Sequence, residues 1–439
     1  MSASPPRTWE PEIKIVSFRL DNGLTLLVLP DHHVPVVSLQ LHYRVGSRHE
    51  LPGITGISHL FEHLMFRGTE ELGPEEFSRI LQAKGGEINA FTTKDHTSYF
   101  ENLPAEHLEL AVRLEADRLK HLKLDEENFR TELQVVLSER KLRSVDSPFG
   151  LVEEQLYATA YTQHPYQWPV IGRDQDLRRL TLADCHSYYR THYHAGNLIV
   201  VVAGDVDPEA ARDLMVRYFG DIPNPGLPES PPVVEPPQRG ERRAIFKKVS
   251  QVEAFFAGFH IVGLGHPDIY PLTLLAVILS TGKSSRFYQE FVRTGRAAEM
   301  EADLAPPPWS TQDPDLLVIR AVAAPGNALA ALEADVWSLI ETLKKQGVKP
   351  EELARAKKMV KSQVVQALSK NFYRGLLVGL FHLKTGDASQ VNLMLRNYEA
   401  VDQDDLRRVA QTYLREDNRT VVTLKPVSPE ESQSLGPLV

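Results

Sequence analysis

The chain has 439 residues, of which 42% are hydrophobic and 24% charged, and its formal net charge is -9. This length exceeds what one ordinary hydrophobic core supports, so we expect two to four domains. The acidic balance excludes a general attraction to nucleic acid or to anionic membrane surfaces. The single cysteine, Cys185, excludes an intramolecular disulfide and any zinc site built from several cysteines.

The N-terminal sequence MSASPPRTWEPEIKI lacks the basic segment and the apolar segment that make up a secretory signal. No apolar run approaches the roughly 18 to 20 residues that would span a bilayer. The longest run, residues 270–279, is expected to form a buried core helix. We therefore expect a cytoplasmic protein without a membrane span, or a periplasmic one if a leader peptide has been removed.

The predicted elements alternate between strands and runs of helices. FRLDNGLTLLVLP places an Asn-Gly turn between alternating apolar residues, which indicates a β-hairpin, and VVSLQLHYRVG alternates as a half-buried strand does. Helical periodicity follows in residues 74–84, 105–121 and 125–143, and returns in residues 328–346. This order favours an α+β layer fold with a largely antiparallel sheet.

The sequence GISHLFEHLMFRGT, residues 56–69, places two histidines and a glutamate within five positions. On a helix, His59 and His63 lie one turn apart on one face, where two imidazoles can bind one zinc ion and a carboxylate is a common third ligand. Glu62 borders this face and could accept a proton from a metal-bound water. The alternative is a surface helix with incidental histidines. The apolar flanks favour a buried helix, in which a charge is costly unless it is paired or bound to metal.

A carboxylate ligand can come from the downstream sequence NFRTELQVVLSERKLRSVDSP. Glu132 and Glu139 lie two helical turns apart and therefore face the same way, and the apolar residues between them indicate a partly buried helix. The alternative is a pair of surface glutamates in ion pairs with Arg130, Arg140 or Lys141.

Two pairs of segments indicate an internal duplication. LTLADCHSYYRTHYHAGNLIVVVAGDVDPEA resembles AVDQDDLRRVAQTYLREDNRTVVTLKPVSPEE, with Asp184 matching Asp405 and Asn197 matching Asn418 at a common spacing of 221 residues. Upstream, VVSLQLHYRVG matches VEAFFAGFHIVG at a similar spacing. A period this long is typical of two homologous halves rather than of a solenoid.

A segment dense in proline and charge separates these two halves. Such a sequence cannot form a core and is typical of a semi-extended linker. We therefore expect an N-terminal half at residues 1–223, a linker at residues 224–243 and a C-terminal half at residues 244–439.

The motif His59-Leu-Phe-Glu62-His63, followed by a glutamate 76 positions after the second histidine, resembles the inverted zinc motif of the pitrilysin, insulysin and mitochondrial-processing-peptidase family. GGEINAFTTKDHTSYF, HPYQWPVIG and NLIVVVAGDVDPE are similar to segments that recur in that family. The two-half organisation is also the family's, so the resemblance covers almost the whole chain. It implies one half of a clamshell-shaped zinc metalloendopeptidase that acts on peptides or small unfolded polypeptides.

Carried over residue by residue, the resemblance assigns a role to each polar residue named above. His59, His63 and Glu139 would bind one Zn²⁺ ion per chain and leave a fourth position for water. Glu62 would act as the general base on that zinc-bound water. Glu132 would orient a ligand histidine or hold water.

The resemblance also implies that the peptide substrate binds as an added β-strand. The sequence INAFTTK matches the family segment that pairs with an extended peptide, so Asn89, Ala90, Phe91 and Thr92 are the expected substrate-binding residues, with Asn89 and Ala90 at the cleavage position. The alternative is an ordinary strand and turn of the sheet.

The second half carries no zinc motif, and it departs from the family pattern at one nearby position. No histidine or glutamate occurs in residues 280–285, which lie about 221 positions after the zinc motif. Many members carry an arginine and a tyrosine seven residues apart that reach the substrate across the chamber. Here Arg293 is present, but Met300 occupies the tyrosine position and cannot donate that hydrogen bond.

Two arrangements would complete the site. One chain of two halves makes only half of a clamshell, so we favour a heterodimer with a homologous zinc-free subunit that carries the Arg/Tyr pair. The alternative is a homodimer or self-sufficient enzyme. Two rival functions are a non-catalytic scaffold or regulatory subunit and a peptide-binding module with a structural metal. The intact ligand set and the candidate base argue against both.

Overall fold

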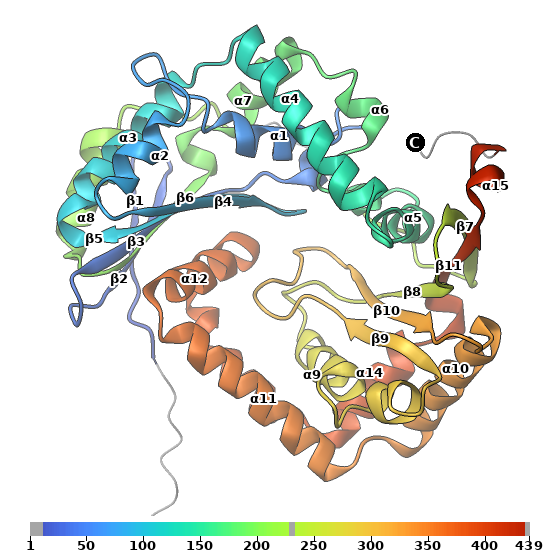
Figure 1. Ribbon diagram of the computed structural model, residues 1–439. Helices are drawn as coiled ribbons and strands as arrows, with labels where there is room; N and C mark the ends of the chain where they lie inside the picture. Colours follow the sequence, from blue (N-terminus) through green and yellow to red (C-terminus); the bar gives the residue numbers. More distant parts are fainter. Residues whose placement is uncertain (1–11, 228–232, 435–439) are drawn as a thin grey trace, which may run out of the picture.

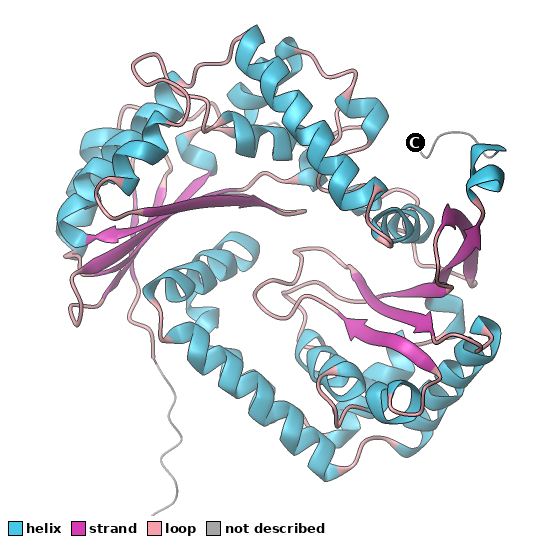
Figure 2. Ribbon diagram, viewed as in Figure 1, coloured by secondary structure: helices cyan, strands magenta, loops and turns pink. Residues whose placement is uncertain are grey.

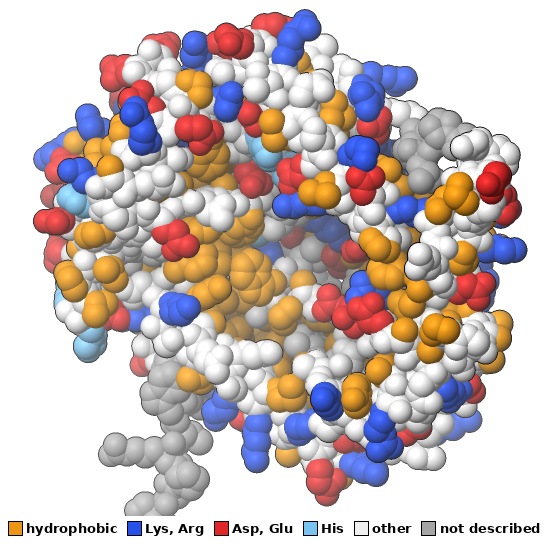
Figure 3. Space-filling view, viewed as in Figure 1, with side chains coloured by type: hydrophobic (Ala, Val, Ile, Leu, Met, Phe, Trp, Pro, Cys, Tyr) orange, Lys and Arg blue, Asp and Glu red, His pale blue; other side chains and the backbone are white. Residues whose placement is uncertain are grey.

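The computed structural model describes residues 12–227 and 233–434. Most of the N-terminal segment discussed above and residues 228–232 of the predicted linker lie outside this described part. Two layered halves lie side by side around a central hollow, which is also visible in the space-filling view (Figures 1 and 3). Each half combines one sheet with packed helices, so the predicted α+β class is confirmed (Figure 2).

The first half is built on a six-stranded sheet with the order β1-β2-β6-β3-β5-β4. Only β2 and β6 pair in parallel; the other neighbouring pairs are antiparallel. The Asn-Gly hairpin forms as predicted: Gly23 has a φ of 87°, which glycine adopts at little cost, and its N–H donates to Leu20 O at 2.8 Å. The strands are β1 Val16–Arg19, β2 Thr25–Pro30, β3 Val36–Tyr43, β4 Glu87–Thr92, β5 Thr97–Pro104 and β6 Leu198–Gly204.

The second half repeats this arrangement in a five-stranded sheet with the order β7-β11-β8-β10-β9. Here β7 and β11 form the parallel pair, and each remaining neighbouring pair is antiparallel. The order matches that of β2-β6-β3-β5-β4, so β4 and β9 are equivalent edge strands. The strands are β7 Arg242–Val249, β8 Ala254–His260, β9 Ala297–Asp303, β10 Leu316–Ala323 and β11 Arg419–Val427.

The predicted duplication extends to individual hydrogen bonds. Asn197 Nδ2 donates to His192 O at 2.8 Å, at the end of one helix, and Asn418 Nδ2 donates to Tyr413 O at 2.8 Å, at the end of its counterpart. Each asparagine therefore satisfies a carbonyl that the helix end leaves without a partner. The two halves therefore share this local contact as well as their strand order.

Helices cover one face of the first sheet (Figure 1). Their apolar sides pack against strand residues such as Leu39, Leu41 and Tyr99, which are almost fully buried. The helices predicted at 74–84, 105–121 and 125–143 are present with slightly different ends. The first-half helices are α1 Ile57–Leu64, α2 Glu76–Gln82, α3 Leu108–His121, α4 Glu126–Arg140, α5 Gly150–Ala160, α6 Asp174–Leu177, α7 Leu182–His192 and α8 Pro208–Phe219.

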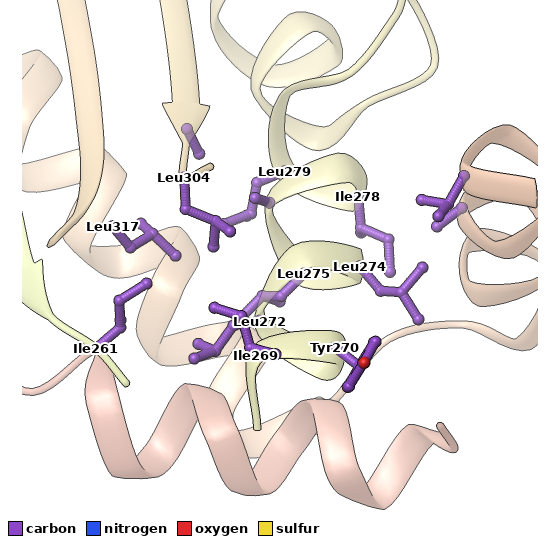
Figure 4. Packing of buried hydrophobic residues seen from close by; sticks show 14 of the residues in the cluster. Ile261, Ile269, Tyr270, Leu272, Leu274, Leu275, Ile278, Leu279, Leu304 and Leu317 are labelled. Atoms are coloured by element: carbon purple, nitrogen blue, oxygen red, sulfur yellow. The ribbon is translucent and has the colours of Figure 1, made fainter. Parts of the chain in front are cut away.

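In the second half, α9 is the central core helix. Leu272, Leu275 and Ile278 have no exposed surface, and Figure 4 shows them among Leu304, Leu317 and other apolar side chains. The buried helix expected at residues 270–279 is therefore confirmed. The second-half helices are α9 Ile269–Ser280, α10 Leu329–Gln346, α11 Pro350–Leu368, α12 Asn371–Thr385, α13 Met394–Ala400, α14 Gln403–Tyr413 and α15 Pro429–Ser434.

The two halves exchange equivalent helices. Helices α5 and α12 begin 221 residues apart, and each packs on the sheet of the other half. Leu156 of α5 is buried against Phe256 and Leu316 of the second sheet. In α12, Phe372 O accepts a hydrogen bond of 2.7 Å from Gln40 Nε2 of β3. Each half is therefore held to the other by a helix that it receives from it. The domain boundaries at residues 223 and 244 stay a prediction.

Candidate metal centre

Helix α1 carries His59, Glu62 and His63, and its start is fixed by a buried carboxylate. Glu50 is 2% exposed, and its two oxygens accept the N–H groups of Gly56 at 2.8 Å and Ser58 at 2.9 Å. These N–H groups belong to the first turn of the helix and would otherwise lack partners. The cap fixes the turn from which His59 projects.

Helix α4 lies beside α1 and supplies the carboxylate (Figure 1). Glu139 Oε2 is 3.3 Å from His63 Nε2 and 3.8 Å from His59 Nε2. Within the described residues, His59, His63 and Glu139 form the one group of histidine, cysteine and carboxylate side chains close enough to hold a metal ion, with ligand atoms all within 4.8 Å of one another. The structure therefore brings together the three residues predicted as ligands.

The geometry of this group suits a tetrahedral zinc ion. Ligands about 2.1 Å from such an ion are separated from one another by about 3.4 Å. The two measured separations from Glu139, 3.3 Å and 3.8 Å, lie near that value. Two imidazoles and one carboxylate are also donors that zinc commonly accepts in catalytic sites. The residues present thus fit a zinc ion without rearrangement of the helices.

The surroundings keep one histidine neutral. Burial lowers the pKa of His59 to about 3, and its Nδ1 is buried without a hydrogen-bond partner. For His63, burial alone would lower the pKa, but the hydrogen bond to Glu132 and the charge of Glu139 raise it overall. A metal ligand must be neutral imidazole, which His59 already is at physiological pH.

Glu62 lies beside the ligand group in a partly buried position. Burial raises the pKa of its carboxyl group, whereas a 2.6 Å hydrogen bond donated by Thr92 Oγ1 lowers it. Thr92 is the last residue of β4. The candidate base is therefore held by the edge strand that was predicted to bind the substrate.

The residues around the ligands are themselves held by polar contacts. Glu132 Oε2 lies 3.1 Å from His63 Nδ1, and Glu132 Oε1 lies 3.2 Å from Arg67 Nε. The other oxygen of Glu139, Oε1, forms an ion pair with Arg143 at 2.9 Å. A carboxylate on the distal nitrogen fixes the orientation and tautomer of a ligand histidine.

The alternative expectation for this glutamate pair named three cations as partners, but the arginines found beside the pair are Arg67 and Arg143. Arg130 pairs with Glu126, Arg140 with Glu154 and Lys141 with Asp146, so none of the three cations neutralises Glu132 or Glu139.

The remaining predicted substrate residues line up along β4, which is the free edge of the first sheet. Asn89 is exposed, and its Oδ1 accepts the N–H of Ala90 at 2.8 Å. The ring of Phe91 lies 6.1 Å from that of Trp309, which belongs to the second half. Past the end of β4, a cavity of about 390 Å³ opens between the halves, lined by Lys94 and Asp315 among others.

Arg293 and Met300 lie apart from this group. Arg293 is exposed in the second half, and in the described part of the chain no hydrogen bond or ion pair joins it to the zinc-site residues. Met300 in β9 is 6% exposed and packs in the hydrophobic core. Its side chain therefore offers no donor to the hollow.

Several contacts of this site escaped the sequence reasoning. Glu50 caps α1 from outside any helix, and nothing in the local sequence indicates that role. Arg67, which follows α1, contacts Glu132 on α4, and the two residues are far apart in the sequence. Arg143 is different, because its position four residues after Glu139 is the spacing of a helical ion pair and could have been recognised.

Comparison with known proteins places the chain in a family. The sequence profile described as "Insulinase (Peptidase family M16)" matches residues 26–174, and the one described as "Peptidase M16 inactive domain" matches residues 179–360. The zinc protease PqqE of Helicobacter pylori is 32% identical over 417 residues, which cover 93% of this chain and 92% of that protein.

Solved structures agree with this comparison. The crystal structure of a protease from Helicobacter pylori is 31% identical, has a TM-score of 0.89 and covers 94% of this chain and 100% of its own. A peptidase M16 inactive domain from Pseudomonas fluorescens is 16% identical with a TM-score of 0.84, covers 95% and 99% of the two chains, and shares the fold.

The chain belongs to the M16 peptidase family, and the family assignment made from its HxxEH motif is confirmed. The profile of the inactive domain begins near the end of the first half, extends into the second half and does not include the HxxEH motif. Among the described residues we find no helix whose length and hydrophobicity would let it cross a membrane.

Proposed function

We propose that the chain is a zinc-dependent endopeptidase. The observation that carries the proposal is the convergence of His59, His63 and Glu139, with Glu62 beside them on the same helix. Three protein ligands leave one coordination position for water or substrate, which is typical of catalytic rather than structural zinc. The zinc protease relative from Helicobacter pylori supports the same chemistry.

Each residue then has a definite task. When bound, zinc would supply a Lewis acid that polarises the scissile carbonyl and lowers the pKa of water. Glu62 takes the proton of the attacking water and returns it to the leaving amine. Thr92 holds the Glu62 carboxyl in place, and Glu132 fixes the ring of His63.

The substrate in this proposal is a peptide that extends the first sheet. The outer edge of β4 is unpaired within the described residues, and its backbone can hydrogen-bond to an extended chain. Asn89 and Ala90 lie on this strand close to Thr92 and hence to Glu62. Recognition through the backbone favours unfolded peptides over particular sequences.

A partner subunit completes the proposal. Met300 is buried where many relatives of the family carry a tyrosine, so this chain needs a donor from elsewhere. A homologous zinc-free subunit with the Arg/Tyr pair would supply it, and a homodimer is the second possibility. In a peptide-cleavage assay, the isolated chain should be weakly active and such a subunit should restore activity. High activity of the isolated chain would contradict the heterodimer.

A non-catalytic scaffold or regulatory subunit is the competing function, because such chains keep the fold without needing the metal. The structural likeness to an M16 inactive domain is compatible with it. Replacing Glu62 with Gln separates the two. The variant should lose about 10²- to 10⁴-fold in peptidase activity while it retains zinc. A parent chain that cleaves no peptide in a broad screen, with or without a partner, would favour the scaffold.

A further inference from the structure

The helix that carries Glu139 continues past its regular end. Helix α4 ends at Arg140, and a π-helical turn follows at Lys141–Val145, closed by a 2.8 Å hydrogen bond from Asp146 N to Lys141 O. Turns of this type are rare and occur preferentially at functional sites. This turn starts two residues after a predicted metal ligand.

The turn contacts the carboxylate of Glu139 through Arg143. Arg143 lies within it and forms an ion pair with Glu139, in which the arginine Nη2 lies 2.9 Å from Oε1, while Oε2 faces His59 and His63. The side chain of Arg143 is 70% exposed, so this ion pair contributes little to stability. Its effect is to orient the carboxylate, and that effect depends on where the turn holds Arg143.

A buried lysine of the second half forms hydrogen bonds with the backbone of this turn and of the residues after it. Lys248 of β7 is 8% exposed, and its ammonium group donates to Val145 O at 2.7 Å and also to Ser147 O. Carbonyl groups at the end of a helical segment carry partial negative charge and attract a cation. A buried ammonium group is costly without such partners, so the contact holds both sides in place.

Helix α5 confines the turn from another side. A Cβ atom on Gly150 would lie 2.5 Å from Arg143 O and 2.7 Å from Ser144 Cα, so only glycine allows α5 to start against the turn. Arg140 is 3% exposed and binds both oxygens of Glu154 in α5, at 2.8 Å and 2.9 Å. Because α5 packs on the second sheet, this contact also ties the end of α4 to the second half.

We propose that the zinc-free half positions the third metal ligand, with Lys248 as a positioning residue. Lys248 holds the turn at residues 141–145, the turn places Arg143, and Arg143 turns Glu139 Oε2 toward His59 and His63. This inference rests on the zinc site of the proposed function. It gives the second half a role in the metal centre, although that half has no ligand of its own.

The test compares Lys248→Met with Lys248→Arg, which keeps a donor, and with Lys247→Met, which removes a 41%-exposed lysine next to it on the same strand. Zinc affinity is measured in the full chain by competition with a chromophoric chelator, and thermal unfolding of the zinc-free chain is measured alongside. Lys248→Met should weaken zinc binding about tenfold, because it displaces Arg143, the partner of the ligand Glu139, and such partners typically contribute 10- to 100-fold. Lys248→Arg should restore most of the affinity, and Lys247→Met should leave it unchanged.

A second variant keeps the test decisive if Lys248→Met folds poorly. Arg143→Gln removes an exposed side chain and should weaken zinc binding to a similar extent, whereas Arg130→Gln on helix α4 should not. Both residues act through the carboxylate of Glu139, so their effects should not multiply. The zinc affinity of the double variant Lys248→Met/Arg143→Gln should be about the same as that of the single variant that binds zinc less tightly.

Two results would overturn the inference, and they are distinguishable from a failure of the proposed function. The first is a folded Lys248→Met chain whose zinc affinity lies within about twofold of the parent. The second is a double variant whose loss of zinc affinity equals the product of the two single losses, as for independent sites. Either result, with zinc bound by the parent, rejects the positioning role alone. A parent chain that binds no zinc rejects the proposed function together with it.

Discussion

Thr92 on strand β4 donates a 2.6 Å hydrogen bond to Glu62 on helix α1. This contact joins the edge strand that is proposed to hold the peptide to the residue that is proposed to move the proton. A substrate paired with β4 would therefore lie in fixed register with the base. Positioning of this kind lowers the entropic barrier of the reaction, and small displacements can cost much of the rate.

Thr92→Val should reduce peptidase turnover about tenfold, because it removes a hydrogen bond to a charged group without changing the shape of the side chain. Zinc content should stay at the parent level. Thr92→Ser keeps the hydroxyl group and serves as the control, so it should retain most of the activity. Equal turnover in the valine and serine variants would show that the hydrogen bond does not position Glu62.

Glu132→Ala should weaken zinc binding about 10- to 100-fold, because it releases the ring of His63 and removes the carboxylate that lies between His63 and Arg67. The matched control is Glu126→Ala, which removes an exposed glutamate paired with Arg130 on the same helix. Competition with a chelator measures both variants. Similar zinc affinities for the two would contradict the role assigned to Glu132.

Gly379→Ala should destabilise the chain, although alanine is normally the better helix former. A Cβ atom at this position of α12 would lie 2.6 Å from His42 Nε2 and 2.8 Å from its Cδ2, so the exchanged helix could not pack closely on the first sheet. We expect a loss of about 1 to 3 kcal/mol in urea unfolding, as for other overpacked cores. Gly240→Ala is the control, because a Cβ atom there meets nothing within 4 Å. A stabilised Gly379→Ala chain would contradict the close packing of α12.

The buried His42 should make stability depend on pH. Burial lowers the pKa of His42 from 6.5 to about 3. Between these two pH values the imidazole is protonated in the unfolded chain but not in the folded chain. Stability is therefore lost as the pH falls below 6.5, by about 2 kcal/mol between about pH 7 and pH 5 for this group. Urea unfolding of the zinc-free chain at several pH values measures the slope, and His42→Asn should be less pH-dependent by that amount. An unchanged slope would contradict the prediction.

Local patterns in the sequence predicted much of this fold because each depends on neighbouring residues. The turn at Asn22 and Gly23, the apolar run of α9 and the spacing of His59 and His63 are all short-range features. The matched pair Asn197 and Asn418 extended the reasoning to the duplication, since each asparagine performs the same local task at a helix end.

Long-range contacts could not be predicted in this way. The exchange of α5 and α12 depends on which sheet each helix covers, and both sheets offer a similar apolar face. The contacts of Glu50 with α1 and of Lys248 with the turn after α4 likewise join segments that carry no mutual signal in one sequence. The substrate-binding role of Arg293 stays a prediction. The same holds for the cytoplasmic location of the protein.

The central claim is that His59, His63 and Glu139 form one zinc site, and native mass spectrometry of the purified chain tests it most directly. The account predicts one zinc ion per parent chain, and none retained by His63→Ala or Glu139→Ala under the same conditions while both variants remain folded by circular dichroism. A parent chain without zinc, or ligand variants that keep a full equivalent of zinc, would contradict it.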